Sequence, residues 1–372
     1  MVVFAKLTLG DQHSVILKQD GSVWSTSFAF HGDREVLPGF KKYFEEAISS
    51  DVMAAAAGGG HSIVLKQDFS IWSVGRNYYG QLGDGTKTRR DSFSFATMIP
   101  GAQAIAAGGY HSMILTKAGV VWTTGWNKHG QLGGGLTSYA TRFRQVISSG
   151  AQALAAGDLH SLVLMDDGSV WAAGKNLFGQ LGDGSKIDKR NFVKVIAGDA
   201  MDVAAGGDHS MVLKKGGSVW SVGRNEQGQL GDGSFEDKFF YVKAIPKNAK
   251  IMAAGKQHSM VLKQDGSLWA TGYNQYGQLG NRLTANSNTF EQVIADGVKA
   301  VAVGAFHSMV IKQDGSIWAT GSNMYGQFGE GSVESGSVFV RLPLFENSEC
   351  HDVYGLLSLM CSFSILLSQC TQ

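Results

Sequence analysis

Seven histidines recur along the chain, and each is followed directly by a serine. These residue types could do chemistry, because histidine ligates zinc and also serves as the general base of a serine nucleophile. Successive histidines are 48 to 50 residues apart, and a tryptophan lies 11 residues after each one. The histidines are His13, His61, His111, His160, His209, His258 and His307. A residue present in every copy of a repeat is expected to serve the fold first, so the repeat has to be interpreted before its chemistry.

A fixed period near 49 residues indicates one supersecondary unit copied seven times. In the third copy, residues 102–147, an alanine-rich run is followed by three segments that begin at His111, Val120 and Phe143. These segments have the alternation or the β-branched residues of short strands. Four short strands per unit are typical of a propeller blade. We therefore predict an all-β fold, a seven-bladed β-propeller of four-stranded antiparallel blades, over residues 1–344.

Smaller features of the repeat predict how a blade is built. Asp-Gly pairs such as Asp20-Gly21 lie between the second and third strands, and they favour a two-residue hairpin. Phe69 replaces the glycine in the second copy, so a different or looser turn is expected there. The alanine-rich strand should be innermost, where space is short. The repeated tryptophans should fill the gaps between blades as core residues.

The repeats share the motifs AAGGxHS, QDGSVW and GxNxxGQLGDG in one register. Over residues 2–344 these units closely resemble those of the regulator of chromosome condensation family, which implies a seven-bladed propeller. That family includes an exchange factor for the nuclear GTPase Ran, the plant UV-B photoreceptor, a secreted β-lactamase inhibitor and many domains that bind proteins or chromatin. Fold membership therefore does not settle the function.

Two of these activities can be compared with the sequence. The resemblance implies that UV-B sensing needs tryptophans directly before the histidines of adjacent blades, and none stands there. It also implies that Ran exchange uses a long insertion and a basic N-terminal tail, which the even spacing and the start of the chain do not show. The residues before the seven histidines are Gln12, Gly60, Tyr110, Leu159, Asp208, Gln257 and Phe306.

The chemistry of the repeated residues is constrained by the predicted ring. One histidine per blade would be spread around the axis, so no three would converge as zinc requires. A serine nucleophile would also need an orienting acid and an oxyanion donor, and nothing unique supplies them. The GxNxxG loop follows a strand without opening a helix, unlike phosphate-binding loops. We expect no catalytic residue, no metal and no cofactor, and a non-enzymatic protein unless it exchanges guanine nucleotides.

Composition narrows the class of partner. Lys and Arg number 32 against 31 Asp and Glu, a formal net charge of +1, so no global charge attracts nucleic acid or a membrane. The three cysteines all lie in the last 23 residues, and no N-x-S/T glycosylation site is present. An intracellular protein, cytoplasmic or nuclear, is therefore expected.

The predicted contact surface is the face that carries the loops after the first and third strands. Variable positions in these loops, before the histidine and inside GxN, are free to recognise a protein partner, and tyrosine, tryptophan and arginine suit an interface. Trp126, the tryptophan outside the repeated position, serves either recognition or loop packing. Aromatic residues before GQLG, such as Tyr79 and Phe178, are interpreted as structural. The predicted partner-binding residues are Arg76, Tyr110, Trp126, Lys175, Asp208, Arg224, Tyr273 and Phe306.

Two further segments leave alternatives open. Arg89, Arg90, Lys189 and Arg190 could form a basic patch, or they are dispersed solubilising charges. Residues 345–372 form an apolar tail, uncharged from Val353 onward, which is interpreted as extra or closing strands or as a membrane anchor.

Three functions remain as hypotheses. The first is a non-enzymatic propeller scaffold that binds a protein through its His and GxN loops. The second is guanine-nucleotide exchange on a small GTPase. The third is chromatin or nucleic-acid binding through the basic patch.

Overall fold

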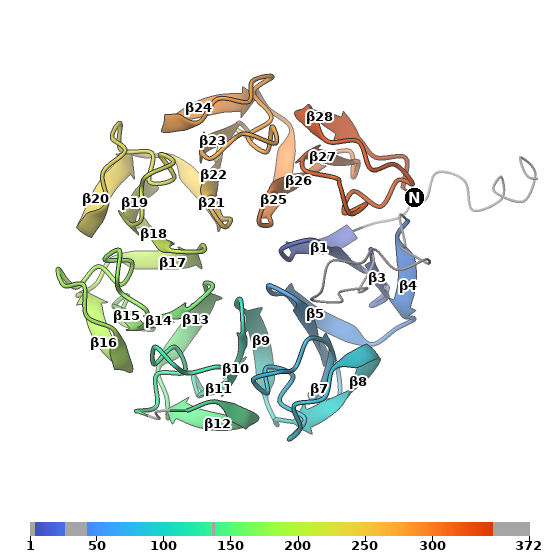
Figure 1. Cartoon of the computed structure of the whole chain (residues 1–372), viewed down its shortest axis with the longest axis vertical. Helices are drawn as coiled ribbons and strands as arrows, with labels where there is room; N and C mark the ends of the chain where they lie inside the picture. Colours follow the sequence, from blue (N-terminus) through green and yellow to red (C-terminus); the bar gives the residue numbers. More distant parts are fainter. Residues whose placement is uncertain (1–3, 27–42, 136–137, 345–372) are drawn as a thin grey trace, which may run out of the picture.

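The computed structural model describes residues 4–26, 43–135 and 138–344, which form 28 strands in seven four-stranded antiparallel sheets. The sheets are arranged as blades around one axis (Figure 1). The predicted fold class, an all-β seven-bladed propeller, is therefore confirmed. No helix in the described ranges is long and apolar enough to cross a membrane.

The strands follow the same order in every blade. The innermost strands are β1 (Phe4–Leu9), β5 (Val52–Ala57), β9 (Ala102–Ala107), β13 (Ala151–Ala156), β17 (Ala200–Ala205), β21 (Ala249–Ala254) and β25 (Val298–Val303). The second strands are β2 (Ser14–Lys18), β6 (His61–Lys66), β10 (His111–Thr116), β14 (His160–Met165), β18 (His209–Lys214), β22 (His258–Lys263) and β26 (His307–Lys312). The third strands are β3 (Val23–Ser25), β7 (Ser70–Gly75), β11 (Val121–Gly125), β15 (Val170–Gly174), β19 (Ser218–Gly223), β23 (Leu268–Gly272) and β27 (Ile317–Gly321). The outermost strands are β4 (Glu45–Ile48), β8 (Arg90–Met98), β12 (Ala140–Ile147), β16 (Lys189–Ile196), β20 (Lys238–Ile245), β24 (Ser287–Ile294) and β28 (Gly336–Arg341).

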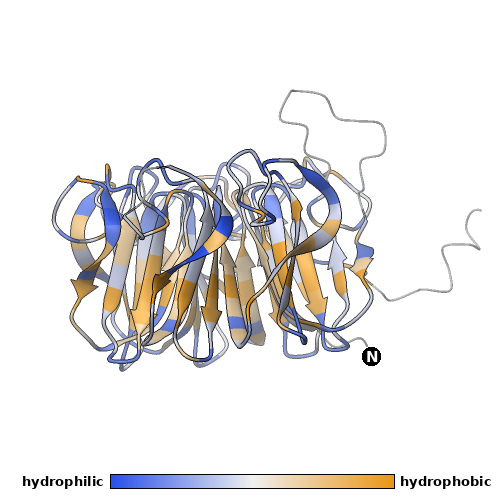
Figure 2. Cartoon of the chain, turned by 90° about the horizontal axis from the view of Figure 1, so that it is seen from below, coloured by the Kyte–Doolittle hydropathy of each residue, from blue (hydrophilic) through white to orange (hydrophobic). Residues whose placement is uncertain are grey.

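The apolar core lies between neighbouring blades. Between the second and third blades, Ile63 and Leu65 of β6 pack with Ile105 of β9 and Ile114 of β10. The second strand of each blade is buried almost throughout, because a sheet covers each of its faces. Figure 2 shows the result from the side: apolar strands run through the disc, and more polar loops lie at its two faces.

The hairpins between the second and third strands differ from the prediction. Gly21 N donates to the Lys18 carbonyl at 3.2 Å, and Lys18 N donates to the Ser22 carbonyl at 3.0 Å. The loop therefore has three residues, with only the last of them, Gly21, at a positive φ of 82°. This is a type I turn followed by a left-handed residue, so the predicted two-residue hairpin is wrong in length although right in place.

The expected loosening at Phe69 is also wrong. Phe69 N donates to the Lys66 carbonyl at 3.0 Å, as the glycines do in the other blades. The second blade keeps the same turn by holding Phe69 at a φ of 66°, in the left-handed region. A side chain at that φ is strained, by about 1–2 kcal/mol.

The repeated tryptophans are half-buried, less than the predicted core position implies. Four of them pack against clusters shared by two blades, as predicted: Trp24, Trp72, Trp122 and Trp318. Trp72 packs against a cluster that includes Val15 and Leu17 of the preceding blade. Its Nε1 donates to Ser70 Oγ at 3.0 Å, and the Lys66 ammonium lies 4.7 Å from its ring centroid. The indole therefore packs at the outer edge of the interface between the two blades, and the lysine lies on the outer face of the indole ring.

The ring closes between the first and last blades of the described chain. Leu7 and Leu9 of β1 belong to the same buried cluster as Met309 and Ile311 of β26. Phe44 belongs to the same cluster, and its N–H donates to the Gly329 carbonyl at 3.3 Å. Closure thus occurs within residues 4–344, and the predictions for the tail 345–372 concern residues outside the described ranges.

Candidate functional site

The loops after the first and third strands share one face of the disc, as the sequence predicted. In blades two to seven the residue inside GxN donates its N–H to the carbonyl of the residue before the histidine. Examples are Trp126 to Tyr110 and Arg224 to Asp208, both at 2.9 Å. The two sets of variable positions are therefore neighbours, and we call the surface that they form the loop face.

The histidine–serine pairs are hydrogen-bonded between blades. His61 Nε2 lies 2.8 Å from Ser112 Oγ, and Ser112 Oγ donates to the Gln81 carbonyl at 2.8 Å. Because the serine has a single proton, His61 must donate from Nε2, which leaves Nδ1 as the unprotonated nitrogen. Burial lowers the pKa of His61 to about 3. A histidine that donates to the hydroxyl cannot take its proton, so this geometry does not prepare a nucleophile.

The first group of loop-face residues is an aromatic cluster on blades two and three. Tyr79 stacks on Trp126 with ring centroids 4.8 Å apart, and Tyr110 meets Trp126 edge-on at 5.4 Å. His129 also meets the indole edge-on, with ring centroids 5.9 Å apart. Tyr110 is 37% exposed, so the cluster reaches the surface. We call these four residues the Trp126 cluster.

A charged group lies on blades four and five. Asp208 accepts from Lys175 Nζ at 2.9 Å and from Gln180 Nε2 at 3.0 Å. Lys175 and Arg224 lie 5.0 and 4.8 Å from the ring centroid of Phe178. Both cations thus contact the Asp208 carboxylate and the Phe178 ring. These side chains are half-buried except for Gln180, which is buried.

A second aromatic cluster lies on blades six and seven. The ring centroids of Tyr273, Tyr276 and Phe306 are 5.3 to 6.2 Å apart, at mutual angles of 57° to 67°. Tyr276 is exposed, and Met324 in the neighbouring blade is 59% exposed. We call Tyr273, Tyr276 and Phe306 the Tyr273 cluster.

The predicted partner-binding residues are therefore gathered into three groups, although the structure does not test whether they bind. Arg76, the eighth of them, lies over the Gly60 backbone in the second blade. Tyr79, Phe178 and Tyr276 were interpreted as structural, but their rings contact the predicted residues in these groups. Their position before GQLG, in the same loops as the predicted residues, could have indicated this contact.

The predicted basic patch is largely paired within its own blades. Arg90 contacts Asp84 at 2.8 Å, Lys189 contacts Asp183 at 3.0 Å, and Arg89 contacts Asp91 at 2.8 Å. Arg190 is exposed. Because an aspartate neutralises each of these three cations, the geometry favours the alternative of dispersed solubilising charges. A basic patch stays a prediction.

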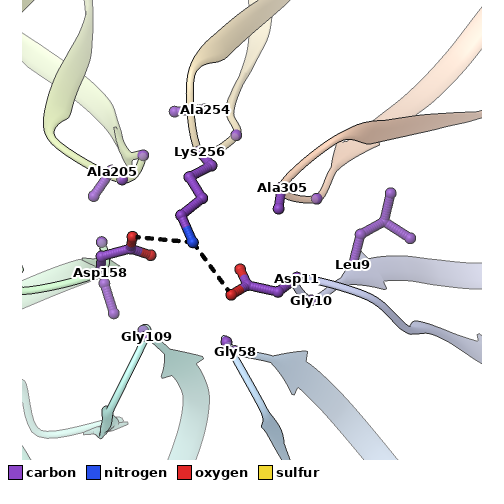
Figure 3. A pocket seen from close by; sticks show the side chains of 18 of the residues that line it. Leu9, Gly10, Asp11, Gly58, Gly109, Asp158, Ala205, Ala254, Lys256 and Ala305 are labelled. Atoms are coloured by element: carbon purple, nitrogen blue, oxygen red, sulfur yellow. Dashed lines mark hydrogen bonds and ion pairs between the residues drawn. The ribbon is translucent and has the colours of Figure 1, made fainter. Parts of the chain in front are cut away.

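A well on the propeller axis was not predicted. Its volume is about 180 Å³, and the ends of all seven innermost strands line it. In Figure 3 the Lys256 side chain extends across the well toward Asp11 and Asp158, and each of the three residues comes from a different blade. Lys256 Nζ lies 3.5 Å from Asp11 and 3.9 Å from Asp158. These charged residues stand two positions before the histidine, where the other copies carry glycine or alanine. That difference between copies is the feature of the sequence that could have predicted the well.

Burial sets the ionisation of this group. It raises the pKa of Asp158 to about 7, and the charge of Asp11 adds to that effect. It also raises the pKa of Asp11, against the opposing attraction of Lys256. The Lys256 ammonium is instead kept charged, because the two carboxylates raise its pKa by more than burial lowers it.

Known proteins share this fold. No curated protein matches the sequence significantly. The crystal structure of Kap60 bound to yeast RCC1 (Prp20) is similar at 21% identity, with a TM-score of 0.74 over 82% of this chain and 79% of that chain. Human WBSCR16 is similar at 21% identity, with a TM-score of 0.71 over 83% and 87%.

A second structure of Prp20p, from Saccharomyces cerevisiae, is 22% identical, with a TM-score of 0.73 over 86% of this chain and 83% of that one. These likenesses concern the fold. The family model described as the RCC1-like domain matches residues 2–238 and again 96–369. The chain therefore belongs to the RCC1-like domain family.

Proposed function

We propose that this propeller is a non-enzymatic scaffold that binds a protein partner through its loop face. The observation that carries the proposal is the gathering of variable side chains there. Two aromatic clusters and one group of cations on a shared phenylalanine occupy separate sectors of one surface. Aromatic residues and arginine dominate the energetics of protein interfaces, whereas the repeated residues beneath them build the ring.

Protein binding is also what the similar structures concern. One is of Prp20 bound to Kap60, and the other was described with the binding of Prp20p to Gsp1p and histones. At 21% and 22% identity these partners are not transferred to this chain. They support the class of function, a propeller that binds proteins.

Affinity capture with single variants of each sector tests the proposal. We expect Trp126→Ala, Arg224→Ala and Tyr273→Ala each to lose at least tenfold of the captured partner, as hot-spot truncations worth about 1.4 kcal/mol or more do. Met201→Ala is the matched control, because Met201 is 57% exposed at the opposite end of an innermost strand. Capture that survives all three variants, at unchanged melting temperature, would show that the partner binds elsewhere.

Guanine-nucleotide exchange is the second candidate, supported by the reported binding of Prp20p to Gsp1p. It needs no metal or catalytic base in the propeller. Purified protein would then accelerate the release of a fluorescent nucleotide from a small GTPase, and Trp126→Ala would reduce that rate. Nucleic-acid binding is disfavoured by the local pairing of Arg89, Arg90 and Lys189.

A further inference from the structure

The axial well is lined mostly by glycines and alanines. The position two residues before each histidine lines it, and most copies carry glycine or alanine there. The loops approach closely, since a Cβ on Gly59 or Gly109 would lie 2.8 Å from a carbonyl oxygen of the next blade. The charged side chains of the lining are those of Asp11, Asp158 and Lys256.

These three side chains leave a carboxylate in excess. Lys256 Nζ is 3.5 Å from Asp11 and 3.9 Å from Asp158, whereas a charge-assisted N–H···O bond is about 2.7–2.9 Å long. One ammonium is thus shared loosely by two carboxylates. In the described part of the chain no hydrogen bond reaches the Asp158 carboxylate, which is 32% exposed toward the well. A second cation would find acceptor oxygens that Lys256 does not saturate.

The charged groups around the well leave Asp158 as the carboxylate without a close cation. Arg76 attracts Asp11, so Asp11 lies under the influence of two cations. Asp208 is paired with Lys175 at 2.9 Å, so that pair is close to neutral toward Asp158. Tyr110, which belongs to the Trp126 cluster, lies near enough to Lys256 to interact with it, so the well lies close to the surface proposed to bind the partner.

We propose that the axial well takes one basic side chain, a lysine ammonium or an arginine guanidinium, from the protein that binds the loop face. This inference rests on the proposed function. A cavity of about 180 Å³ has room for the end of a long side chain. The incoming cation would pair with the Asp158 carboxylate, which Lys256 approaches only to 3.9 Å, and the glycine-lined wall lets a flexible stem pass down the axis.

Occupancy of the well depends on pH. Burial and the charge of Asp11 raise the pKa of Asp158 to about 7. Above that pH Asp158 is ionised and attracts a cation, and below it Asp158 is neutral. The cation therefore binds more tightly as pH rises from 5.5 to 8.

Binding of a small lysine mimic to the whole protein tests this site. The probe is N-acetyl-lysine amide, and N-acetyl-norleucine amide is the neutral control. Side-chain carboxyl NMR resonances of Asp11 and Asp158 report occupancy. At pH 8 we expect a saturable shift with the lysine probe only, with an affinity at least about tenfold weaker at pH 5.5, where Asp158 is protonated.

Matched variants separate this site from general charge effects. Asp158→Asn keeps the shape of the side chain and should abolish the lysine-dependent shift of Asp11 without changing the melting temperature. Asp166→Asn is the matched control, because it removes an exposed carboxylate of the same blade in the hairpin on the opposite face, and it should change the probe affinity by less than about twofold. A lysine probe that leaves both resonances unmoved, or a norleucine probe that moves them equally, would overturn the proposal.

The two proposals can fail separately. If the probe binds in the well while the Trp126, Arg224 and Tyr273 variants still capture the partner, the site stands and the loop-face function is wrong. If those variants lose the partner but the probe does not bind, the loop face stands and the well is wrong.

Discussion

At the scale of single residues, the histidine–serine pairs form a closed ring of hydrogen bonds. His209 donates to Ser259 and His258 to Ser308, each at 2.8 Å, and the same contact recurs in all seven blades. Six of the serines also donate to a glutamine carbonyl, as Ser259 does to Gln229 at 2.8 Å. The residues that first suggested catalysis therefore act as links between blades.

The neutral histidines predict steep acid denaturation. Burial lowers the pKa of His209 to about 3 and that of His13 to about 4, whereas the unfolded residue titrates near 6.5. Below pH 6.5 the unfolded chain binds more protons, so each histidine removes up to about 1.4 kcal/mol of stability per pH unit as pH falls toward 3. Asp11, Asp158 and Asp202, with their raised pKa values, act in the opposite sense but are three groups against seven.

Urea unfolding in steps from pH 8 to pH 4 measures this effect. We expect the free energy of unfolding to change little above pH 7 and to fall progressively below pH 6.5. A stability that stays level between pH 6.5 and pH 4.5 would mean that the histidines are protonated in the folded state.

At the scale of elements, the blades show which features a sequence pattern can determine. Alternation and turn residues predicted four strands per unit, since both are local properties. The hairpin length was missed because Asp-Gly occurs in two-residue and in three-residue loops alike. The burial of the tryptophans was overestimated because one face of each ring is not covered by the core. A lysine of the neighbouring strand lies on that face instead, as Lys66 does over Trp72.

The strained turn at Phe69 gives a prediction at this scale. Phe69→Gly and Phe69→Ala both remove the ring, but only alanine keeps a Cβ at the positive φ of 66°. The glycine variant should therefore be the more stable of the two by about 1 kcal/mol, the reverse of the usual order. Equilibrium urea unfolding of both variants checks this. An alanine variant equal to or more stable than the glycine variant would contradict the turn geometry.

At the scale of the whole molecule, closure of the ring creates what no single repeat contains. Asp11, Asp158 and Lys256 belong to blades one, four and six, and they become neighbours only on the axis. The sequence shows three charged residues at a position that is elsewhere glycine or alanine, but their contact depends on the ring geometry. The groups on the loop face likewise form between adjacent blades, as Tyr79 and Trp126 do.

Closure of the ring predicts that hydrogen bonds between the first and last blades contribute as much to the free energy of unfolding as the equivalent bonds between internal blades. Ser14 Oγ lies 3.0 Å from His307 Nε2 and donates to the Gln327 carbonyl at 2.7 Å. Ser161 makes the equivalent bonds to His111 and Gln131. Ser14→Ala and Ser161→Ala should each cost about 1–3 kcal/mol, with similar values. A negligible cost for Ser14→Ala alone, in calorimetry or urea unfolding, would show that the ring is open in solution.

The central claim, that the loop face binds a protein partner, is tested most directly by lysine cross-linking of the captured complex, read by mass spectrometry. Lys128 and Lys175 lie in GxN loops on the loop face, whereas Lys117 and Lys215 are exposed in hairpins on the opposite face. Cross-links from the partner to Lys128 and Lys175, and none to Lys117 or Lys215, are the predicted result. Cross-links concentrated on Lys117 and Lys215 would contradict the account.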